Sequence, residues 1–232
     1  ARVVVVGGGY IGLEVAATCR ELGVDVTVLE MADRVMNRVV CEPVSRYYEA
    51  EHRKHGVNIV LGARMQDFFG DAGGRVAGVR CADGSEHPAD FAVVGVGVLA
   101  EDALARAAGL HCDNGIAVDE YCRTSDPAIW AIGDCTSHPS LRYGYRVRLE
   151  SVDNAFEQAG TAALDILGAP LAHDKVPWFW SDQYHHKLLI VGLSQGHDRW
   201  LLRGDPASHS FSAAYLRGGE LIAIDTVNNA KD

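Results

Sequence analysis

The sequence contains no apolar stretch close to the roughly 20 residues that a membrane-spanning helix needs. We expect no secretory signal peptide either, since the sequence opens directly on a predicted strand and charged residues appear at Arg2 and Glu14. Basic residues are in the minority, with 21 Lys and Arg against 31 Asp and Glu and a net charge of −10. Proteins that bind duplex nucleic acid normally carry a basic face. We therefore expect neither a membrane protein nor a nucleic-acid-binding protein.

Cysteine is present, but not in a spacing that indicates chemistry. The six cysteines are Cys19, Cys41, Cys81, Cys112, Cys122 and Cys135. No two of them are spaced C-x-x-C, which excludes a redox-active disulfide or a zinc knuckle of that type. Scattered thiols are typical of the reducing cytoplasm, and free cysteines are often buried. We expect a cytoplasmic protein with inert thiols.

The chain is long enough for one large or two modest domains, with 232 residues of which 48% are hydrophobic. Residues 3–6 are all valine, which predicts a strand buried on both faces. A glycine loop follows, then a predicted helix over residues 13–22 that ends at Gly23, and a strand over residues 24–30. This order predicts that an α/β fold opens with a strand–helix–strand unit.

Further elements are predicted along the rest of the chain. Helices are expected over residues 46–55, 104–108 and 152–167, and strands over 57–60, 91–96, 116–118 and 128–132. Turn clusters within residues 63–87 predict an antiparallel meander. After a linker between Pro170 and Pro177, short strands are expected over residues 188–191, 200–203, 210–216 and 221–224. The last group predicts a second, smaller β-rich unit.

The glycine loop carries the most specific motif. Gly7, Gly9 and Gly12 fit the pattern G-x-G-x-x-G between a predicted strand and a predicted helix. In that pattern the first glycine allows a tight turn, the second lets the backbone approach a pyrophosphate, and the third lets helix and strand pack closely. The start of the helix then offers unpaired N–H groups to the phosphates. The motif predicts a dinucleotide site.

Two acidic residues refine this prediction. Glu30 ends the second predicted strand, where a carboxylate accepts hydrogen bonds from the adenosine ribose and repels a 2′-phosphate. We therefore expect NADH rather than NADPH, although Arg34 and Arg38 follow and can bend back. Glu14 lies near the first turn of the helix. It either complements the helix dipole or binds the nicotinamide carboxamide, and its position alone does not separate the two.

A second motif ends in Gly133-Asp134, directly after the strand predicted over residues 128–132. The carboxyl ends of strands in α/β sheets are where ligands bind, and an acid there can hold a polyhydroxyl chain such as the ribityl of a flavin. The alternative is an aspartate that caps a helix or closes a turn.

Five stretches together resemble the NADH-dependent ferredoxin reductases of the glutathione-reductase superfamily, a group that includes the putidaredoxin and rubredoxin reductases. These stretches are VVGGGYIGLEVA over residues 5–16, VGVG over 94–97, TSD and AIGDC within 124–135, RLESVDNA over 148–155 and VPWFWSDQ over 176–183. Such reductases serve bacterial aromatic-ring dioxygenases and cytochrome P-450 systems.

The resemblance implies an α/β fold of three parts: a Rossmann-like NAD-binding domain over residues 1–115, the C-terminal part of an FAD-binding domain over 116–172, and a small C-terminal α+β domain of the reductase dimerisation type over 173–232. The implied cofactors are FAD and NADH. The glycine fingerprint for FAD that opens such proteins is not in this sequence, and we expect a fragment that continues at both ends. Ala100 and Glu101 replace the Pro-Asn more usual in the family, which we interpret as loop variation.

The resemblance also implies roles for individual residues. NADH is expected at Gly7, Gly9, Tyr10, Ile11, Gly12, Glu14 and Glu30, with Gly97 close to it. The flavin is expected at Gly133 and Asp134, at Glu150, Ser151 and Val152 where a long helix begins, and at Trp180 against the isoalloxazine. Trp180 and Glu150 are the catalytic candidates. For Trp178 and Trp180 the alternative is packing in the core.

The function implied is electron transfer from NADH through FAD to an iron–sulfur ferredoxin, of the 2Fe–2S type or a rubredoxin, by a monomer or weak homodimer. Arg142, Arg146 and Arg148 form either a basic patch for this partner or an ordinary solvated loop. The alternatives are a monodehydroascorbate-reductase-like or apoptosis-inducing-factor-like flavoprotein and, from another class, an NAD-binding module without flavin. A disulfide reductase needs a C-x4-C pair, which this sequence lacks.

No metal site is predicted from the adjacent pair His185-His186. Neighbouring side chains on a strand point to opposite faces and rarely share a metal.

Overall fold

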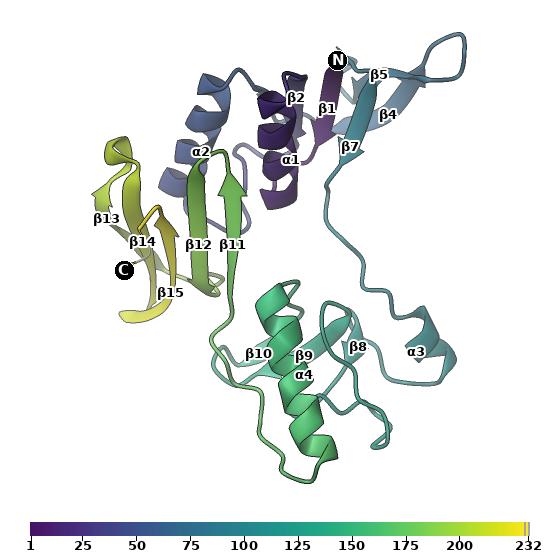
Figure 1. Ribbon diagram of the computed structural model, residues 1–232, viewed down its shortest axis with the longest axis vertical. Coiled ribbons are helices and arrows are strands. Elements are labelled where there is room, and N and C mark those ends of the chain that lie inside the picture. Colours follow the sequence, from purple (N-terminus) through teal and green to yellow (C-terminus); the bar gives the residue numbers. More distant parts are fainter. Residues whose placement is uncertain (230, 232) are drawn as a thin grey trace. The chain divides into compact units, whose positions relative to one another are not determined.

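The computed structural model describes residues 1–229 and 231 (Figure 1). The chain divides into two compact units, one made of Ala1–Gly97 together with Trp180–Asp232 and the other of Val98–Phe179. The chain therefore leaves the first unit after Gly97 and returns to it at Trp180. The three predicted domains group the chain differently, and their assignment to NAD, FAD and C-terminal parts remains a prediction.

The first unit opens with a parallel sheet of four strands in the order β3-β2-β1-β7. Its elements are β1 (Arg2–Val6), α1 (Tyr10–Glu21), β2 (Asp25–Glu30), α2 (Glu42–Lys54), β3 (Asn58–Leu61) and β7 (Phe91–Val94). The valines of β1 are buried, as expected for a strand with neighbours on both sides. The predicted strand–helix–strand opening is confirmed. Helix α2 starts four residues earlier than predicted because Pro43 fits the first turn of a helix.

The predicted meander is confirmed as an antiparallel sheet, β4 (Met65–Gly70), β5 (Val76–Cys81) and β6 (Glu86–Pro88), in the order β4-β5-β6. Val79 and Cys81 of β5 are buried in one cluster with Val4, Val6 and Leu29 of the parallel sheet. The meander thus covers part of the sheet that carries the glycine loop.

The C-terminal sheet has five strands in the order β11-β12-β15-β14-β13, with antiparallel pairing from β12 to β13. The strands are β11 (Trp178–Gln183), β12 (His186–Gly192), β13 (Arg199–Asp205), β14 (Ser210–Arg217) and β15 (Glu220–Val227), with the 3-10 turn η1 (Pro206–Ser208) before β14. Four of these strands were predicted. Strand β11 was not, because its sequence WFWSDQ does not alternate between apolar and polar residues.

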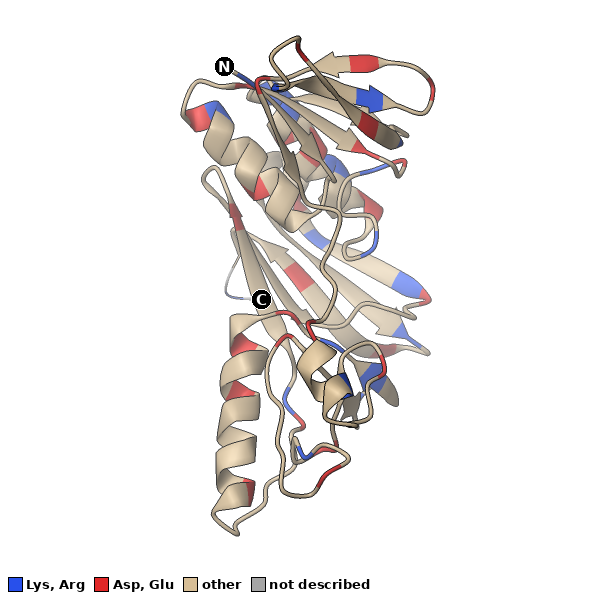
Figure 2. Ribbon diagram, turned by 90° about the vertical axis from the view of Figure 1, so that its right-hand side faces the viewer, with Lys and Arg blue, Asp and Glu red and all other residues tan. Residues whose placement is uncertain are grey.

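The second unit contains α3 (Ala103–Ala107), β8 (Ile116–Ala117), β9 (Thr136–Ser140), β10 (Tyr145–Val147) and the long helix α4 (Val152–Ile166). Its three strands form a sheet in the order β10-β9-β8. Helix α4 carries acidic residues and no Lys or Arg (Figure 2). No helix in the described part of the chain is long and apolar enough to cross a membrane.

The strand predicted over residues 128–132 is wrong. This segment makes only one isolated bridge, between Arg123 and Trp130. The Asp126 side chain accepts a hydrogen bond from Ala128 N, and its backbone carbonyl accepts one from Ile129 N. These bonds close a turn around Pro127, which has no N–H to give to a sheet. The short apolar run at residues 128–132 predicts a strand, but the turn before it prevails.

Candidate functional site

The glycine loop between β1 and α1 excludes side chains at two of its positions. Gly7 has φ of +105°, and a Cβ there lies 2.3 Å from the carbonyl oxygen of Gly95. A Cβ at Gly12 lies 2.0 Å from the carbonyl oxygen of Gly7. Both obstacles are backbone atoms that cannot turn aside. The two glycines therefore let β1, α1 and the end of β7 approach one another closely.

Gly9 is the position that the loop leaves open. It is the N-cap of α1, and no side chain in the described part of the chain caps the helix there. A Cβ at Gly9 meets nothing within 4 Å. The first N–H groups of an uncapped helix need acceptors, and the positive end of the helix dipole favours an anion. The loop thus fits a pyrophosphate, which finds backbone donors and room at the same place.

Glu30 is held against the loop by two backbone donors. Its Oε2 accepts a 2.7 Å hydrogen bond from Gly8 N, and its Oε1 accepts one of 2.7 Å from Ala32 N. Each carboxylate oxygen can accept a further bond, so the group keeps capacity for ribose hydroxyls. The carboxylate is fixed in position before any ligand arrives.

Arg34 is turned away from this carboxylate. Its guanidinium donates to the carbonyl oxygens of Val40, at 2.9 Å, and Asn37, at 2.8 Å, within its own loop. The possibility that Arg34 bends back to Glu30 is therefore not realised. Arg38 is exposed. Arg34 therefore does not provide the arginine that NADP sites usually place at this position.

The position of Glu14 contradicts the interpretation that it complements the helix dipole. Helix α1 begins at Tyr10, and its first turn contains no acidic residue. Glu14 lies in the second turn, beyond the reach of the helix dipole, so the dipole interpretation is wrong. Its Oε1 instead accepts a 2.6 Å hydrogen bond from Ser181 Oγ on β11. The role at the nicotinamide remains a prediction.

Ser181 belongs to a buried polar chain that the sequence analysis missed. Gln183 Nε2 donates to Ser181 Oγ at 3.1 Å, and His52 Nε2 lies 2.9 Å from Gln183 Oε1. Burial lowers the pKa of His52 to about 4, so this ring is neutral. Because an amide oxygen only accepts, His52 donates from Nε2. Glu14 and Ser181 are 167 positions apart in sequence, and no local pattern could have paired them.

The other residues expected near NADH differ in exposure. The ring of Tyr10 is half-buried, and burial raises the pKa of its hydroxyl. Ile11 is exposed, and Gly97 follows β7 with φ of +111° and open space around it. Trp178 and Trp180 keep 41% and 40% of their surface exposed, so neither is a fully buried core residue.

The residues expected at the flavin lie in the second unit, apart from Trp180. Gly133 has φ of +79°, and its N–H donates a 2.6 Å hydrogen bond to Gln158 Oε1 of α4. Asp134 is exposed and precedes the strand β9, so it caps no helix. The helix-cap alternative is therefore wrong, but Asp134 does lie in a turn, which Thr136 N closes by donating to the Gly133 carbonyl at 3.0 Å. The ribityl role remains a prediction.

The start of α4 holds the other three candidates. Ser151 is the N-cap, and its Oγ accepts a 3.2 Å hydrogen bond from Asn154 N. Val152 is exposed in the first turn. Glu150 forms an ion pair with Arg148 just before the helix. The cap leaves the helix terminus well defined, as a contact to a flavin there requires.

The three arginines differ in how their charges are paired. Arg146 donates to the carbonyl oxygens of Val118, at 2.9 Å, and Ser137. Arg148 pairs with Glu150, which offsets its charge. Arg142 and Arg146 are both exposed, so the choice between a basic patch and an ordinary solvated loop stays open.

The cysteines are free, as expected. Cys41, Cys81 and Cys122 are buried, and burial raises the pKa of the Cys122 thiol to about 12. A thiol with a raised pKa is a poor nucleophile, which supports the expectation of inert cysteines.

Comparison with known proteins places these features in a family. Residues 1–159 match the family described as pyridine nucleotide-disulphide oxidoreductase, and residues 178–232 match the reductase C-terminal domain. The chain is 48% identical over 232 residues to the ferredoxin reductase subunit of 5,5'-dehydrodivanillate O-demethylase from Sphingobium sp. strain SYK-6, covering 100% of this chain and 56% of that protein.

Two solved structures are similar over almost the whole chain. The ferredoxin reductase for the CYP199A2 system from Rhodopseudomonas palustris gives a TM-score of 0.96 at 46% identity, over 99% of this chain and 56% of that one. The covalent putidaredoxin reductase–putidaredoxin complex gives a TM-score of 0.94 at 48% identity, over 98% of this chain and 55% of that one.

The chain thus spans a little over half the length of the relatives it matches. The predicted resemblance and the mixed α/β fold with a C-terminal reductase domain are confirmed. The glycine loop with Glu30 lies within the part that matches the first family. The chain therefore belongs to the pyridine nucleotide-disulphide oxidoreductase family.

Proposed function

We propose that this chain is the NADH-binding and C-terminal part of an FAD-dependent oxidoreductase that passes electrons from NADH to an iron–sulfur ferredoxin. The ferredoxin, of the 2Fe–2S type or a rubredoxin, serves a dioxygenase or a cytochrome P-450 system. The proposal is carried by the loop around Gly9, where open space, uncapped N–H groups and the carboxylate of Glu30 meet. These groups match the phosphates and the ribose of a dinucleotide.

The choice of NADH over NADPH rests on charge. Both carboxylate oxygens of Glu30 accept hydrogen bonds from backbone N–H groups, and Arg34 donates to the carbonyl oxygens of Val40 and Asn37. A 2′-phosphate at this position meets a carboxylate, and the guanidinium of Arg34 is not directed at it to offset the repulsion. The ribose 2′-hydroxyl, by contrast, donates to the carboxylate.

The chain's own residues bind and orient the two cofactors. The loop from Gly7 to Gly12 holds the pyrophosphate, and Ser181 holds the carboxylate of Glu14 at the side of the nicotinamide. Asp134 binds the ribityl, while Glu150 and the N-terminus of α4 face the flavin. When bound, NADH supplies a hydride and FAD accepts it and releases the electrons one at a time. Trp180, with its indole partly exposed on β11, provides the surface next to the flavin where the ferredoxin binds.

The partner is inferred from the relatives. The Sphingobium protein is named a ferredoxin reductase subunit, and one of the similar structures is a complex of putidaredoxin reductase with putidaredoxin. We extend this to the present chain, with a monomer or weak homodimer as its state and the cytoplasm as its location. The alternatives, a monodehydroascorbate-reductase-like or apoptosis-inducing-factor-like protein and an NAD-binding module without flavin, find no support in these names.

The full-length protein tests the proposal. We expect it to be yellow and to oxidise NADH rapidly only when an iron–sulfur ferredoxin is added. A colourless protein that still binds NADH contradicts the proposal and supports the NAD-binding module. Faster turnover with the monodehydroascorbate radical than with any ferredoxin supports the reductase of that radical instead.

A further inference from the structure

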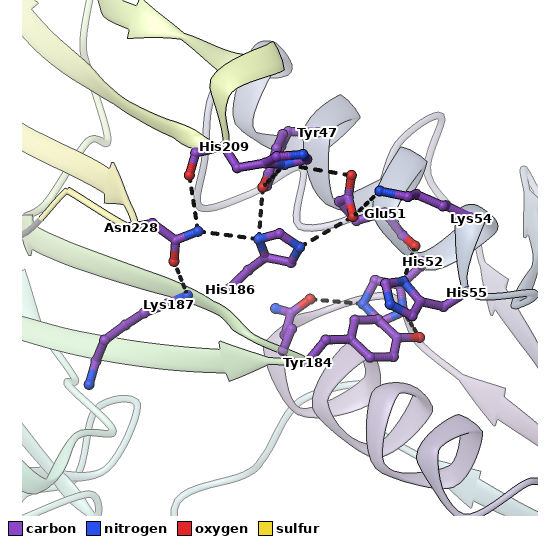
Figure 3. Close-up of polar contacts among 11 residues, drawn as sticks. Tyr47, Glu51, His52, Lys54, His55, Tyr184, His186, Lys187, His209 and Asn228 are labelled. Atoms are coloured by element: carbon purple, nitrogen blue, oxygen red, sulfur yellow. Dashed lines mark hydrogen bonds and ion pairs between the residues drawn. The ribbon is translucent and has the colours of Figure 1, made fainter.

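Three potential metal ligands from separate elements of the first unit converge on one point. Glu51 lies on α2, His186 begins β12, and His209 ends the turn η1 before β14. Their ligand atoms all lie within 4.8 Å of one another. Figure 3 shows the three side chains pointing toward a shared space. His186 is adjacent to His185 in the sequence, whereas the fold brings it next to His209.

The spacing of these atoms fits a shared metal, although His186 Nε2 and Glu51 Oε2 are also within hydrogen-bond distance of each other. His186 Nε2 lies 3.2 Å from Glu51 Oε2, and His209 Nδ1 lies 3.8 Å from Glu51 Oε1. Nitrogen and oxygen ligands about 2.0–2.1 Å from a tetrahedral zinc lie about 3.3–3.4 Å from each other. The separation from His186 to Glu51 is slightly shorter than this value, and the separation from His209 to Glu51 is longer. The second of them is too long for a hydrogen bond.

The burial of two of the three groups suits a cation. His186 keeps 1% of its surface exposed and Glu51 keeps 7%. Glu51 is therefore a buried carboxylate with no backbone donor among the described residues, and its closest cation, Lys54 Nζ, is 3.6 Å away.

A second layer of groups orients the ligands. Tyr47 Oη lies 2.8 Å from His186 Nδ1 and 2.9 Å from His209 Nδ1. Binding of an ion requires the lone pair of His186 on Nε2, which faces Glu51, so Nδ1 carries the proton and donates it to Tyr47 Oη. The Tyr47 hydroxyl proton must then turn away from His209 Nδ1, whose lone pair the ion takes. Asn228 faces the same Nδ1 at 3.3 Å, but its shorter bond, of 3.0 Å, goes to the backbone carbonyl of His209. Asn228 thus holds the η1 turn beside β12.

We propose that Glu51, His186 and His209 form a binding site for a divalent transition-metal cation of the zinc class. Two imidazoles and one carboxylate are a set that zinc accepts, with water as the fourth ligand. His209, with 44% of its side chain exposed, provides access from solvent. The bound ion joins α2 to β12 and β14 and stabilises the first unit by mass action. The site is independent of electron transfer.

Lys54 makes the proposal specific. It competes with the cation for Glu51 Oε2, and its side chain is 65% exposed and able to move into solvent. Removing its charge with Lys54→Gln is therefore expected to tighten metal binding several-fold. If the three residues form only a network of hydrogen bonds, Lys54→Gln is expected to weaken zinc binding or to leave it unchanged.

The test is calorimetric titration of zinc chloride into the full chain after treatment with a chelator. We expect one zinc ion to bind tightly per chain. His209→Asn is expected to weaken this binding by more than about 100-fold, since even residues that only orient the metal ligands contribute about 10- to 100-fold to affinity. Asparagine tolerates the φ of +57° at this position but is too short to reach the ion, so the variant should fold. His185→Asn is the matched control and should bind as the parent does.

Thermal unfolding provides a second measurement. Zinc is expected to raise the midpoint of the parent and of His185→Asn, and to leave that of His209→Asn unchanged. Equal zinc affinity in the parent and in His209→Asn overturns the proposal. So does an equal loss in both histidine variants, since it shows that zinc binds only to surface imidazoles.

Discussion

Ser181 Oγ on β11 donates a 2.6 Å hydrogen bond to Glu14 Oε1 on α1. Ser181 is 1% exposed and directly follows Trp180 in the chain. The bond therefore joins the helix of the glycine loop to the strand that carries the candidate flavin tryptophan. A carboxylate held by a buried hydroxyl is in a fixed orientation before a ligand binds.

Substitution of Ser181 by alanine is expected to lower the free energy of unfolding by about 1.5–3 kcal/mol, because a hydrogen bond to a charged group is lost in a buried place. Urea denaturation of Ser181→Ala, Glu14→Gln and the double variant measures the coupling between the two residues, expected at about 0.5–3 kcal/mol. Glu21→Gln, exposed on the same helix, is the control. Strict additivity of the two substitutions would show that the bond contributes nothing.

Substitutions of two glycines of the loop are expected to affect different properties, namely stability at Gly12 and NADH binding at Gly9. Gly12→Ala puts a Cβ 2.0 Å from the carbonyl oxygen of Gly7, and overpacking against backbone should cost at least about 1–3 kcal/mol of stability. Gly9→Ala meets no atom within 4 Å and should leave stability unchanged. It should nevertheless weaken NADH binding, because the new methyl group occupies the space assigned to the pyrophosphate.

Denaturation and NADH titration of both variants check this pair. If Gly9→Ala binds NADH as well as the parent, the pyrophosphate does not lie at the start of α1.

Glu30→Ala is expected to raise the ratio of kcat/KM for NADPH to that for NADH by about tenfold or more, because a repulsive charge is removed. The loss of hydrogen bonds to the ribose should also slow the reaction with NADH. Steady-state kinetics of the full-length protein with both nucleotides measure the ratio. Asp33→Ala, which removes an exposed carboxylate from the same loop, should leave it unchanged. No shift in the Glu30 variant means that this carboxylate does not select the cofactor.

Trp180→Ala is expected to slow the reduction of a ferredoxin by the full-length protein, because the indole is assigned to the surface where electrons leave. Trp200 on β13 has the same exposed fraction, 40%, and Trp200→Ala serves as the matched control. Stopped-flow measurements separate ferredoxin reduction from flavin reduction by NADH. Equal rates for the two variants would remove Trp180 from the path.

Asp225 makes stability depend on pH. Burial raises the pKa of this carboxyl to about 7, although the hydrogen bond from Tyr215 opposes the shift. In the unfolded chain the pKa is about 3.9. Between these values the folded protein holds a proton that the unfolded chain has lost, so the stabilisation is complete below about pH 4 and is lost as the pH rises through about 7.

The amide in Asp225→Asn stays neutral and does not show this loss. The free energy of unfolding of the variant, relative to the parent, is therefore expected to increase by on the order of 3 kcal/mol between about pH 5 and about pH 8. Chemical denaturation at both pH values measures the difference, and Asp33→Asn is the exposed control. Parallel pH profiles for Asp225→Asn and the parent would contradict the assigned pKa.

Local patterns predicted most of the fold. The valine run of β1, the glycines after α1 and α4 and the turn clusters of the meander are signals within a few residues, and the structure confirms the elements that they predict. The error at residues 128–132 arose where the Asp126-Pro127 turn competes with a short apolar run. Strand β11 was missed because its aromatic side chains mask the alternation on which strand prediction depends.

The sequence by itself determined the glycine loop and the acid that follows it. Gly7, Gly12 and Glu30 belong to one strand–helix–strand unit, in which spacing along the chain nearly dictates spacing in the fold. Tertiary structure alone decided what Glu14 and His186 contact. Ser181 reaches Glu14, and Glu51 and His209 reach His186, because the C-terminal sheet packs in one compact unit with the parallel sheet. Contacts between residues so far apart depend on packing of the whole unit, and no short pattern encodes them.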